Sequence, residues 1–240
     1  MKLAEFANHI LDEVESTNDI ARRLAEEGWP HGTWISARRQ AKGRGRAGRE
    51  WVSTDGNLFL SLVARLPMGA PLTWVPLAAA VAVANVLFAR YPSLPLKLKW
   101  PNDLWLETAS GPAKLGGVLC ESSGGWIVIG IGLNCATAPS GLDQATESLS
   151  GALGRPVRAD DLREELVAEL RQRLVDLPGP GGPEALARTY GERAALAVGS
   201  RVRWNGGEGE VLGLGTAGEL RVKTSGGERR LFAEDIERLR

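Results

Sequence analysis

The chain has 240 residues, of which 43% are hydrophobic and 24% charged, the composition of a soluble globular protein with one large domain or with one large and one small domain. Lys and Arg together number 29, as do Asp and Glu, so the net charge of zero argues against a protein that coats nucleic acid over its whole surface. Two cysteines without Cys-x-x-Cys spacing, Cys120 and Cys135, and two isolated histidines argue against a zinc site; we expect buried thiols in a reducing compartment.

The first third of the chain alternates between strand and helix patterns. Thr17 or Asn18 can cap the first helix, and Gly28 can end it. The third strand is entered through an Asp-Gly turn. The expected elements are strands over residues 9–17, 33–40 and 57–66 and a helix over residues 18–28.

A long apolar segment then predicts a buried helix over residues 73–90, with Pro76 tolerated in its first turn. The segment is too short to span a bilayer and is interrupted by Asn85, and the N-terminus lacks the basic and apolar regions of a signal peptide. We therefore expect a cytoplasmic protein that does not bind membranes.

Four further strands and two helices follow. Residues 124–125 are both glycine and can join the last two strands as a hairpin. Every fourth residue from Leu162 to Leu174 is leucine, which gives a helix one apolar stripe, and Asp161 and Glu164 have the spacing of a capping box. The expected strands cover residues 96–100, 103–107, 114–122 and 126–133, and the helices cover residues 160–177 and 184–196.

The composition changes near the C-terminus. Residues 201–232 consist of short alternating segments separated by Asn-Gly, Gly-Thr-Ala-Gly and Ser-Gly-Gly turns. This pattern predicts a small all-β barrel of roughly 45 residues, packed on its neighbour for stability. We therefore expect two domains, residues 1–194 and residues 195–240.

A glycine-rich loop has the Gly43-x-Gly45-x-x-Gly48 spacing of a dinucleotide-binding turn. Such a turn must lead into a helix, and an acidic residue must follow about 20 positions later. The residues after Gly48 meet neither condition. The loop instead carries Arg44, Arg46 and Arg49 after Lys42. Guanidinium groups bind phosphate or carboxylate through paired donors, so we favour an anion-binding loop over a solvated basic turn.

Three further stretches carry polar residues at strand ends. "KWPND" places Lys99, Asn102 and Asp103 around a strand break, "KLGG" places Lys114 at a strand start, and "GIGLN" ends a strand at Asn134. Each stretch is weak evidence by itself, because a single lysine is usually a surface residue and a single asparagine is usually part of a turn.

Taken together and in this order, the four motifs resemble those of the biotin protein ligases, whose glycine loop reads G-R-G-R-x-G-R-x-W. The resemblance covers essentially the full chain. It implies an α+β fold, in which a mixed, mainly antiparallel sheet of the class II synthetase type has flanking helices and is joined to a small C-terminal SH3-like β-barrel. Many bacterial members begin with a winged helix-turn-helix; here the first expected strand leaves no room for it, so we expect no specific DNA binding.

The resemblance also implies a two-step reaction. The carboxylate of biotin attacks the α-phosphorus of ATP and yields biotinyl-5′-AMP and pyrophosphate. A lysine of a biotin carboxyl carrier protein, or of such a domain in a carboxylase, then attacks the mixed anhydride and releases AMP. Bringing two anions together requires cations and Mg²⁺. We expect a monomer or a homodimer.

By the same resemblance, the polar residues divide into overlapping groups. Lys114 lies between the carboxylate and the α-phosphate, while Asp103 either orients Lys114 or helps to deprotonate the incoming lysine. No metal ligand is expected from the protein. The catalytic residues are Lys114, Arg46, Arg44 and Asp103. The residues expected to bind biotin are Ser16, Thr17, Asn18, Gln40, Gly43, Arg44, Arg46, Lys114, Gly116, Gly117 and Gly130. The residues expected to bind ATP are Arg46, Arg49, Trp51, Lys99, Asn102 and Asn134.

Two alternatives remain open. Lipoate or octanoate ligases share the fold and the chemistry but are not marked by the arginine-rich loop, and an octanoyl transferase would not need a grip on ATP phosphates. A non-catalytic sensor of biotinyl-AMP would keep the pocket but would need a surface for an effector.

Overall fold

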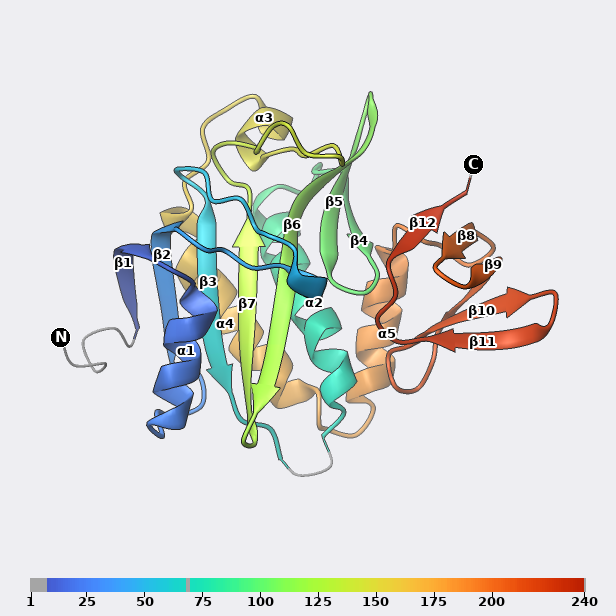
Figure 1. Ribbon diagram of the computed structural model, residues 1–240, viewed down its shortest axis with the longest axis horizontal. Coiled ribbons are helices and arrows are strands. Elements are labelled where there is room, and N and C mark those ends of the chain that lie inside the picture. The colour runs from blue at the N-terminus through green and yellow to red at the C-terminus, as the bar shows by residue number, and fades with distance from the viewer. Residues whose placement is uncertain (1–7, 68–69, 240) are drawn as a thin grey trace.

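A seven-stranded sheet forms the centre of the larger part of the protein (Figure 1). The computed structural model describes residues 8–67 and 70–239. The strand order is β1-β2-β3-β7-β6-β5-β4; β1 and β2 run parallel, and the other neighbouring pairs are antiparallel, which confirms the predicted mixed sheet. The strands are β1 His9–Val14, β2 Trp34–Gln40, β3 Leu58–Ala64, β4 Leu96–Lys99, β5 Asp103–Thr108, β6 Gly111–Ser123 and β7 Trp126–Leu133.

Helices cover both faces of this sheet, with α1 in front of it and α2 and α4 behind it in Figure 1. The alternation of side chains along β3 explains the division. Val63 joins the small core under α1, whereas Leu60 and Leu62 point into the larger core under α2 and α4. The helices are α1 Thr17–Glu26, α2 Val75–Arg90, α3 Leu149–Leu153, α4 Asp160–Asp176 and α5 Gly182–Glu192.

The apolar helix α2 is buried along most of its length, which explains why it lacks a polar face. With the 3₁₀ turn Leu72–Trp74 it forms a 19-residue segment that is long and apolar enough to cross a membrane by length and composition alone. The prediction that the segment is too short was therefore wrong. Because 67% of its most apolar window is buried inside the protein, packing in the core accounts for the same composition.

Two helix starts differ from the capping predictions. The cap of α1 is Ser16, and Thr17 and Asn18 instead lie in the first turn with their side chains buried. Helix α4 begins at Asp160 after Ala159, without a side-chain cap, and the Asp160 carboxylate accepts a bond from Arg163 at 2.8 Å. At α1, tertiary contacts therefore use the polar side chains that the sequence pattern assigns to the cap.

The predicted hairpin between β6 and β7 is confirmed. Ser123 and Trp126 pair across the turn, and the two glycines between them have φ values of 56° and 82°. A two-residue turn with positive φ at both positions is one that glycine adopts without strain.

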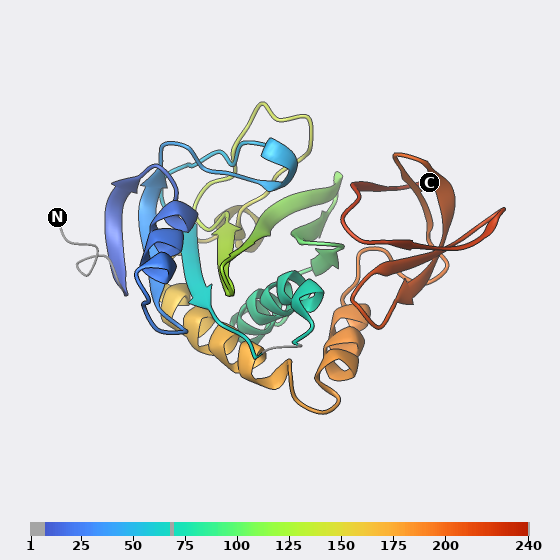
Figure 2. The ribbon, with the colours of Figure 1, turned by 60° about the horizontal axis from the view of Figure 1, so that its bottom comes forward.

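The C-terminal residues form a second, five-stranded antiparallel sheet in the order β11-β10-β9-β8-β12. It lies beside α5 (Figure 2). The turn between β9 and β10 contacts the larger part: the side chains of Thr73, Trp74 and Trp100 each donate a hydrogen bond to one of its carbonyls. The strands are β8 Arg201–Trp204, β9 Gly207–Leu214, β10 Leu220–Thr224, β11 Gly227–Leu231 and β12 Ile236–Arg238.

Candidate functional site

A cavity opens at the N-terminus of α1, between the glycine-rich loop and strands β6 and β7. We call it the inner cavity. It brings together most of the predicted site residues, which lie up to 114 positions apart in the chain, from Ser16 to Gly130. The inner cavity is lined by Ser16, Thr17, Asn18, Gln40, Arg44, Gly45, Trp51, Asn102, Asp103, Lys114, Gly117, Val118, Leu119, Gly130, Ile131 and Gly132.

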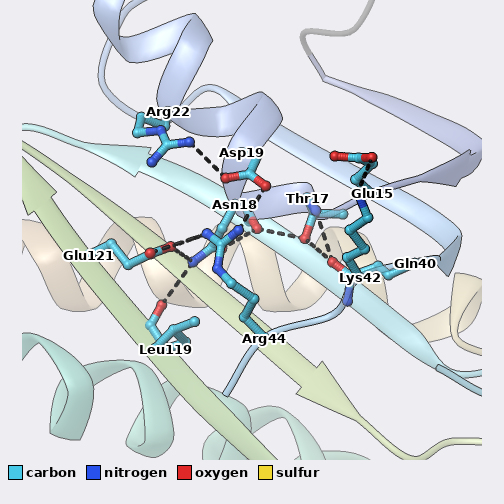
Figure 3. Close-up of polar contacts among 11 residues, drawn as sticks. Glu15, Thr17, Asn18, Asp19, Arg22, Gln40, Lys42, Arg44, Leu119 and Glu121 are labelled. Carbon is cyan, nitrogen blue, oxygen red and sulfur yellow. Dashed lines mark hydrogen bonds and ion pairs between the residues drawn. The ribbon is translucent and has the colours of Figure 1, made fainter. Parts of the chain in front are cut away.

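Thr17, Asn18 and Gln40 line the inner cavity and belong to a polar cluster, part of which Figure 3 shows. Gln40 Oε1 accepts hydrogen bonds from Thr17 N at 2.8 Å and from Thr17 Oγ1 at 3.0 Å. Ser61 Oγ lies 2.8 Å from Thr17 Oγ1 and 2.6 Å from Asn18 Oδ1. Sequence reasoning missed Ser61, although a single polar residue in the middle of the apolar strand β3 was a signal for it. The cluster fixes the orientation of both amides before any ligand arrives.

Lys114 and Asp103 form the central ion pair of the site. Lys114 Nζ lies 2.8 Å from Asp103 Oδ1, and the two side chains are only 14% and 18% exposed. The backbone of Lys114 is fixed as well, because its N–H donates to Ala145 and its carbonyl accepts from Glu147. The sheet therefore presents a largely covered lysine at the edge of the inner cavity, paired with a carboxylate.

The indole of Trp51 lies over the backbone of β6 and β7. A Cβ added to Gly132 would lie 2.6 Å from Trp51 Cε2, and one added to Gly117 would lie 3.5 Å from Trp51 Cζ3. Glycines on these strands therefore permit the ring to lie flat against the sheet. Lys114 Nζ is 5.6 Å from the centre of the same ring. Gly116 faces the opposite side, where an added Cβ would meet the carbonyl of Gly132, so it does not line the inner cavity.

The loop 43–51 closes on itself as a short hairpin. Gly45 N donates to Arg49 O, and Trp51 N donates to Gly43 O. This places Gly43 at the base of the loop rather than in the inner cavity. Ala47 takes a left-handed φ of 54° at the tip. We call residues 43–45 and 49–51 the stem and residues 46–48 the tip.

The three arginines of the loop contact different partners. Arg44 is bound by Asp19 and Glu121, and the hydrogen bond to Asp19 is the main cause that raises the pKa of its guanidinium. Arg46 donates to Asn102 Oδ1 at 2.8 Å and to the carbonyl of Ala233, and burial lowers its pKa. Arg49 forms an exposed ion pair with the C-terminal segment. Arg46 and Arg49 therefore contact the C-terminal segment, whereas Arg44 contacts α1 and β6.

A second cavity, the outer cavity, lies on the other side of Trp51. Lys114, Trp51 and Asn102 line both cavities, and Asn134, Leu142 and others line the outer one. Asn134 donates to the carbonyl of Glu147, while its Oδ1 atom is buried without a hydrogen-bond partner among the described residues. An unused buried acceptor is costly, so this atom is suited to a donor on a ligand.

Lys99 stands apart from the other predicted ATP-binding residues. Its Nζ lies 4.4 Å from the ring centre of Trp105, in a groove that also includes Arg46 and Arg49 and is bordered by the second sheet. Burial lowers the pKa of Lys99, with a smaller contribution from the charge of Lys114. The groove places Lys99, Arg46 and Arg49 near the Lys114–Asp103 pair, together with acidic side chains of the C-terminal segment.

Metal ligands do not cluster in the site. Over residues 8–67 and 70–239, no group of three or more His, Cys, Asp or Glu side chains is arranged to hold a metal ion. The Asp103 carboxylate is engaged by Lys114. A divalent cation here fits best as one carried by phosphate oxygens, as Mg²⁺ commonly is.

Comparison with known proteins gives one consistent result. A sequence model described as the biotin/lipoate A/B protein ligase family matches residues 11–136. The chain is similar to a biotin–[acetyl-CoA-carboxylase] ligase of Mycobacterium tuberculosis, with 34% identity over 85% of this chain and 77% of that protein. It is 41% identical to an enzyme of the same name from Paracoccus denitrificans, over 54% of this chain and 55% of that one.

The fold agrees with a solved structure. The biotin protein ligase of Aquifex aeolicus in complex with biotin and ATP superposes with a TM-score of 0.81 and 26% identity, covering 96% of this chain and 98% of that one. Sequence and fold lead to the same assignment: this chain belongs to the biotin/lipoate A/B protein ligase family.

Proposed function

We propose that this protein is an ATP-dependent ligase that activates biotin as biotinyl-5′-AMP and transfers it to a lysine of a biotin carboxyl carrier protein. Relatives that carry biotin ligase names, and a structural neighbour that holds biotin and ATP, support the reaction class. The observation within the site that favours biotin is that the polar cluster has fewer hydrogen-bond donors than it has polar contacts.

The cluster lacks one hydrogen-bond donor. Its three oxygen–oxygen contacts, Thr17 to Gln40, Ser61 to Thr17 and Ser61 to Asn18, span 2.6–3.0 Å. Gln40 Oε1 and Asn18 Oδ1 can only accept, so two hydroxyl protons serve three contacts. An N–H group from a ligand would relieve this deficit. The ureido ring of biotin carries two N–H donors, whereas the apolar ends of lipoate and octanoate carry none.

The proposed activation step uses the Lys114–Asp103 pair. With the ureido ring at the polar cluster, the carboxylate of biotin extends towards Lys114, which also faces the outer cavity. There the carboxylate oxygen attacks the α-phosphorus, the bond to pyrophosphate breaks, and Lys114 stabilises the charge that develops. The departing pyrophosphate is then bound by Arg46, Arg49 and Lys99, together with Mg²⁺ that enters with ATP.

The nucleobase fits the outer cavity. Trp51 offers a ring for stacking, and the buried Oδ1 atom of Asn134 offers an acceptor for the exocyclic amino group of adenine. Asn102 is bound at both ends, to Val118 O and to Arg46, and so couples this region to the loop tip.

The transfer step and the setting of the protein complete the proposal. The acceptor lysine attacks the carbonyl of the anhydride, AMP departs, and Asp103 takes the proton or orients Lys114. We assign the catalytic role to residues 1–194 and an SH3-like barrel to residues 195–240. We place the protein in the cytoplasm, without specific DNA or membrane partners, as a monomer or a homodimer.

Pyrophosphate release provides the decisive experiment. We expect ATP-dependent pyrophosphate formation with biotin, and at most a trace with lipoate or octanoate. If lipoate or octanoate gives more pyrophosphate than biotin, the proposed substrate is wrong and the preferred acid takes its place. Tight binding of biotinyl-AMP without any turnover would instead indicate a sensor.

A further inference from the structure

The arginine that opens the basic loop is bound by two carboxylates. Arg44 Nη1 lies 2.7 Å from Asp19 Oδ2, and Nη2 lies 3.1 Å and 3.0 Å from the two carboxylate oxygens of Glu121 (Figure 3). To bind a phosphate, Arg44 would have to leave two anions at hydrogen-bond distance. The geometry therefore separates Arg44 from Arg46 and Arg49, although the sequence motif groups the three together.

Glu121 has a second partner in the wall of the inner cavity. Asn18 Nδ2 donates to Glu121 Oε2 at 2.7 Å, and this bond turns Asn18 Oδ1 towards Ser61. One carboxylate on β6 thus connects the stem of the loop with the polar cluster. Neither Glu121 nor Asp19 belongs to a motif that pointed to the site from sequence.

We propose that Glu121, assisted by Asp19, is a positioning residue. It holds Arg44, and through Arg44 the stem of the loop, against the inner cavity, and it orients the amide of Asn18. The tip is held instead by hydrogen bonds of Arg46 to neutral groups, Asn102 Oδ1 and the carbonyl of Ala233, and among the described residues no carboxylate pairs with Arg46. The loop is therefore divided into an anchored stem, which completes the biotin pocket, and a tip that can rearrange over the nucleotide.

The structural test is limited cleavage by trypsin of the ligand-free protein. Glu121→Gln keeps an oxygen acceptor for Asn18 but removes the charge that binds Arg44. We expect cleavage after Arg46 and Arg49 to become about fivefold faster or more, because cleavage follows the population of opened loop. Cleavage outside residues 43–51 reports global unfolding and is used for normalisation.

The chain offers a matched control for this variant. Glu15 pairs with Lys42, directly before the loop, at 2.7 Å, but both side chains are mostly exposed. Exposed pairs contribute little. Glu15→Gln should therefore leave cleavage within about twofold of the wild type. Equal cleavage of the Glu121→Gln and wild-type loops would overturn the proposal.

A double-mutant cycle tests whether Glu121 acts through Arg44. In an Arg44→Gln background, Glu121→Gln should change loop cleavage by less than about twofold, because the partner is already absent. Independent, multiplicative effects would contradict the proposed coupling. Should Glu121→Gln prove unfolded, Asp19→Asn, which removes a single contact of Arg44, takes its place in the same cycle.

A kinetic readout distinguishes positioning from general damage and rests on the proposed function. In the Glu121→Gln variant, KM for biotin should rise about tenfold while kcat stays within about threefold, because the group shapes the pocket without touching the reacting atoms. An equal loss in kcat would argue against a positioning role. If the wild type does not turn over biotin at all, the proposed function fails, while the cleavage experiment still decides the positioning of the loop.

Discussion

At the scale of single residues, the protein places a lysine that is only 14% exposed where the two anionic reactants are proposed to meet. Asp103 pairs with Lys114 at 2.8 Å, so the amine is oriented before any substrate binds. We expect Lys114→Ala to reduce biotinyl-AMP formation by about a hundredfold or more with the fold retained, because preorganised charge is the main source of such catalysis. Pyrophosphate release measures adenylate formation, and circular dichroism measures whether the variant is folded.

Lys223, an exposed lysine of β10, is a control for the loss of positive charge alone. Its replacement by Ala should leave the rate unchanged. Near-normal turnover of the Lys114 variant would remove Lys114 from the chemical step.

Trp51 separates the inner and outer cavities and is the predicted stacking partner of adenine. Base stacking contributes roughly 1–3 kcal/mol. We expect Trp51→Ala to weaken ATP binding about 5- to 150-fold, and biotin binding distinctly less. Isothermal titration with each ligand measures both effects. Trp51→Phe, which keeps a ring over Gly132, should retain most of the affinity. If both ligands lose affinity equally while the melting temperature falls, the ring is a structural element.

Cys135 makes the free energy of unfolding depend on pH in the alkaline range. Its side chain is 0% exposed, and burial raises the pKa of its thiol to about 12. The unfolded thiol ionises near its ordinary value of about 8.5, so this group lowers the free energy of unfolding as pH rises from there towards 12, by about 2 kcal/mol at pH 10. Urea unfolding at pH 7.5 and pH 10 measures the loss. The loss should be smaller by that amount in Cys135→Ala; an equal loss in both proteins would contradict it.

The sequence predicted site residues that stand in short motifs of glycines and charged residues. It did not predict site residues that lie within strands and contact the site only after folding. Lys114 and Asn102 stand in short motifs and were found. Ser61 and Glu121 belong to long strands, and their importance depends on which strands become neighbours. No local pattern specifies that Glu121 faces Arg44, 77 positions earlier.

At the scale of elements, the residues after Gly48 do not open an α-helix, as their sequence predicted, and the structure shows that the glycine-rich loop closes as a short hairpin. The failure of the cap predictions for α1 has a physical reason. Thr17 and Asn18 are good capping residues, yet their bonds to Gln40 and Ser61 are buried, and buried bonds outweigh an exposed cap. Helix α3 was missed because it is only one turn long.

The tip of the loop should control how long the adenylate stays bound. Arg46 lies between Gly45 and Ala47, and its contacts bridge Asn102 and Ala233. A charge-assisted bond to a buried anion contributes roughly 1.5–3 kcal/mol, which means at least about tenfold weaker retention when it is lost. We expect Arg46→Gly to form some biotinyl-AMP and to release it early, so that bystander lysines become labelled.

A blot for biotin on added albumin, at equal adenylate formation, compares this variant with the wild type. Glu15→Gln again serves as a control outside the tip. If the variant labels albumin no more strongly than the wild type, Arg46 does not retain biotinyl-AMP and its role is limited to binding ATP.

At the scale of the whole molecule, the second sheet is attached where the nucleotide is proposed to bind. Composition predicted a small β unit packed on its neighbour but not the place of contact, because the contacts of Trp74 and Trp100 with residues 216–218 join segments more than a hundred positions apart. Trp100 directly precedes Pro101 and Asn102, so the β9–β10 turn supports the segment that holds the loop tip. The polar cluster of the inner cavity lies at the N-terminus of α1, and its hydrogen bonds involve β2, β3 and β6 rather than the second sheet.

This arrangement predicts that loosening the turn affects ATP and not biotin. Gly218 has a φ of +76°, and an added Cβ would lie 3.2 Å from both Leu77 and Trp74, so Gly218→Val should displace the turn through strain and crowding. Trp100 would then lose its acceptor, and Asn102 its support. We expect ATP binding to weaken about tenfold and biotin binding to stay within about twofold, both measured by titration calorimetry. Around Gly226, in the next turn of the same sheet, the one described atom near an added Cβ is Thr224 Oγ1, at 3.8 Å, and Gly226→Val should leave both affinities unchanged. An equal loss for both ligands in the Gly218 variant would mean that docking of the second sheet stabilises the whole protein rather than the nucleotide site.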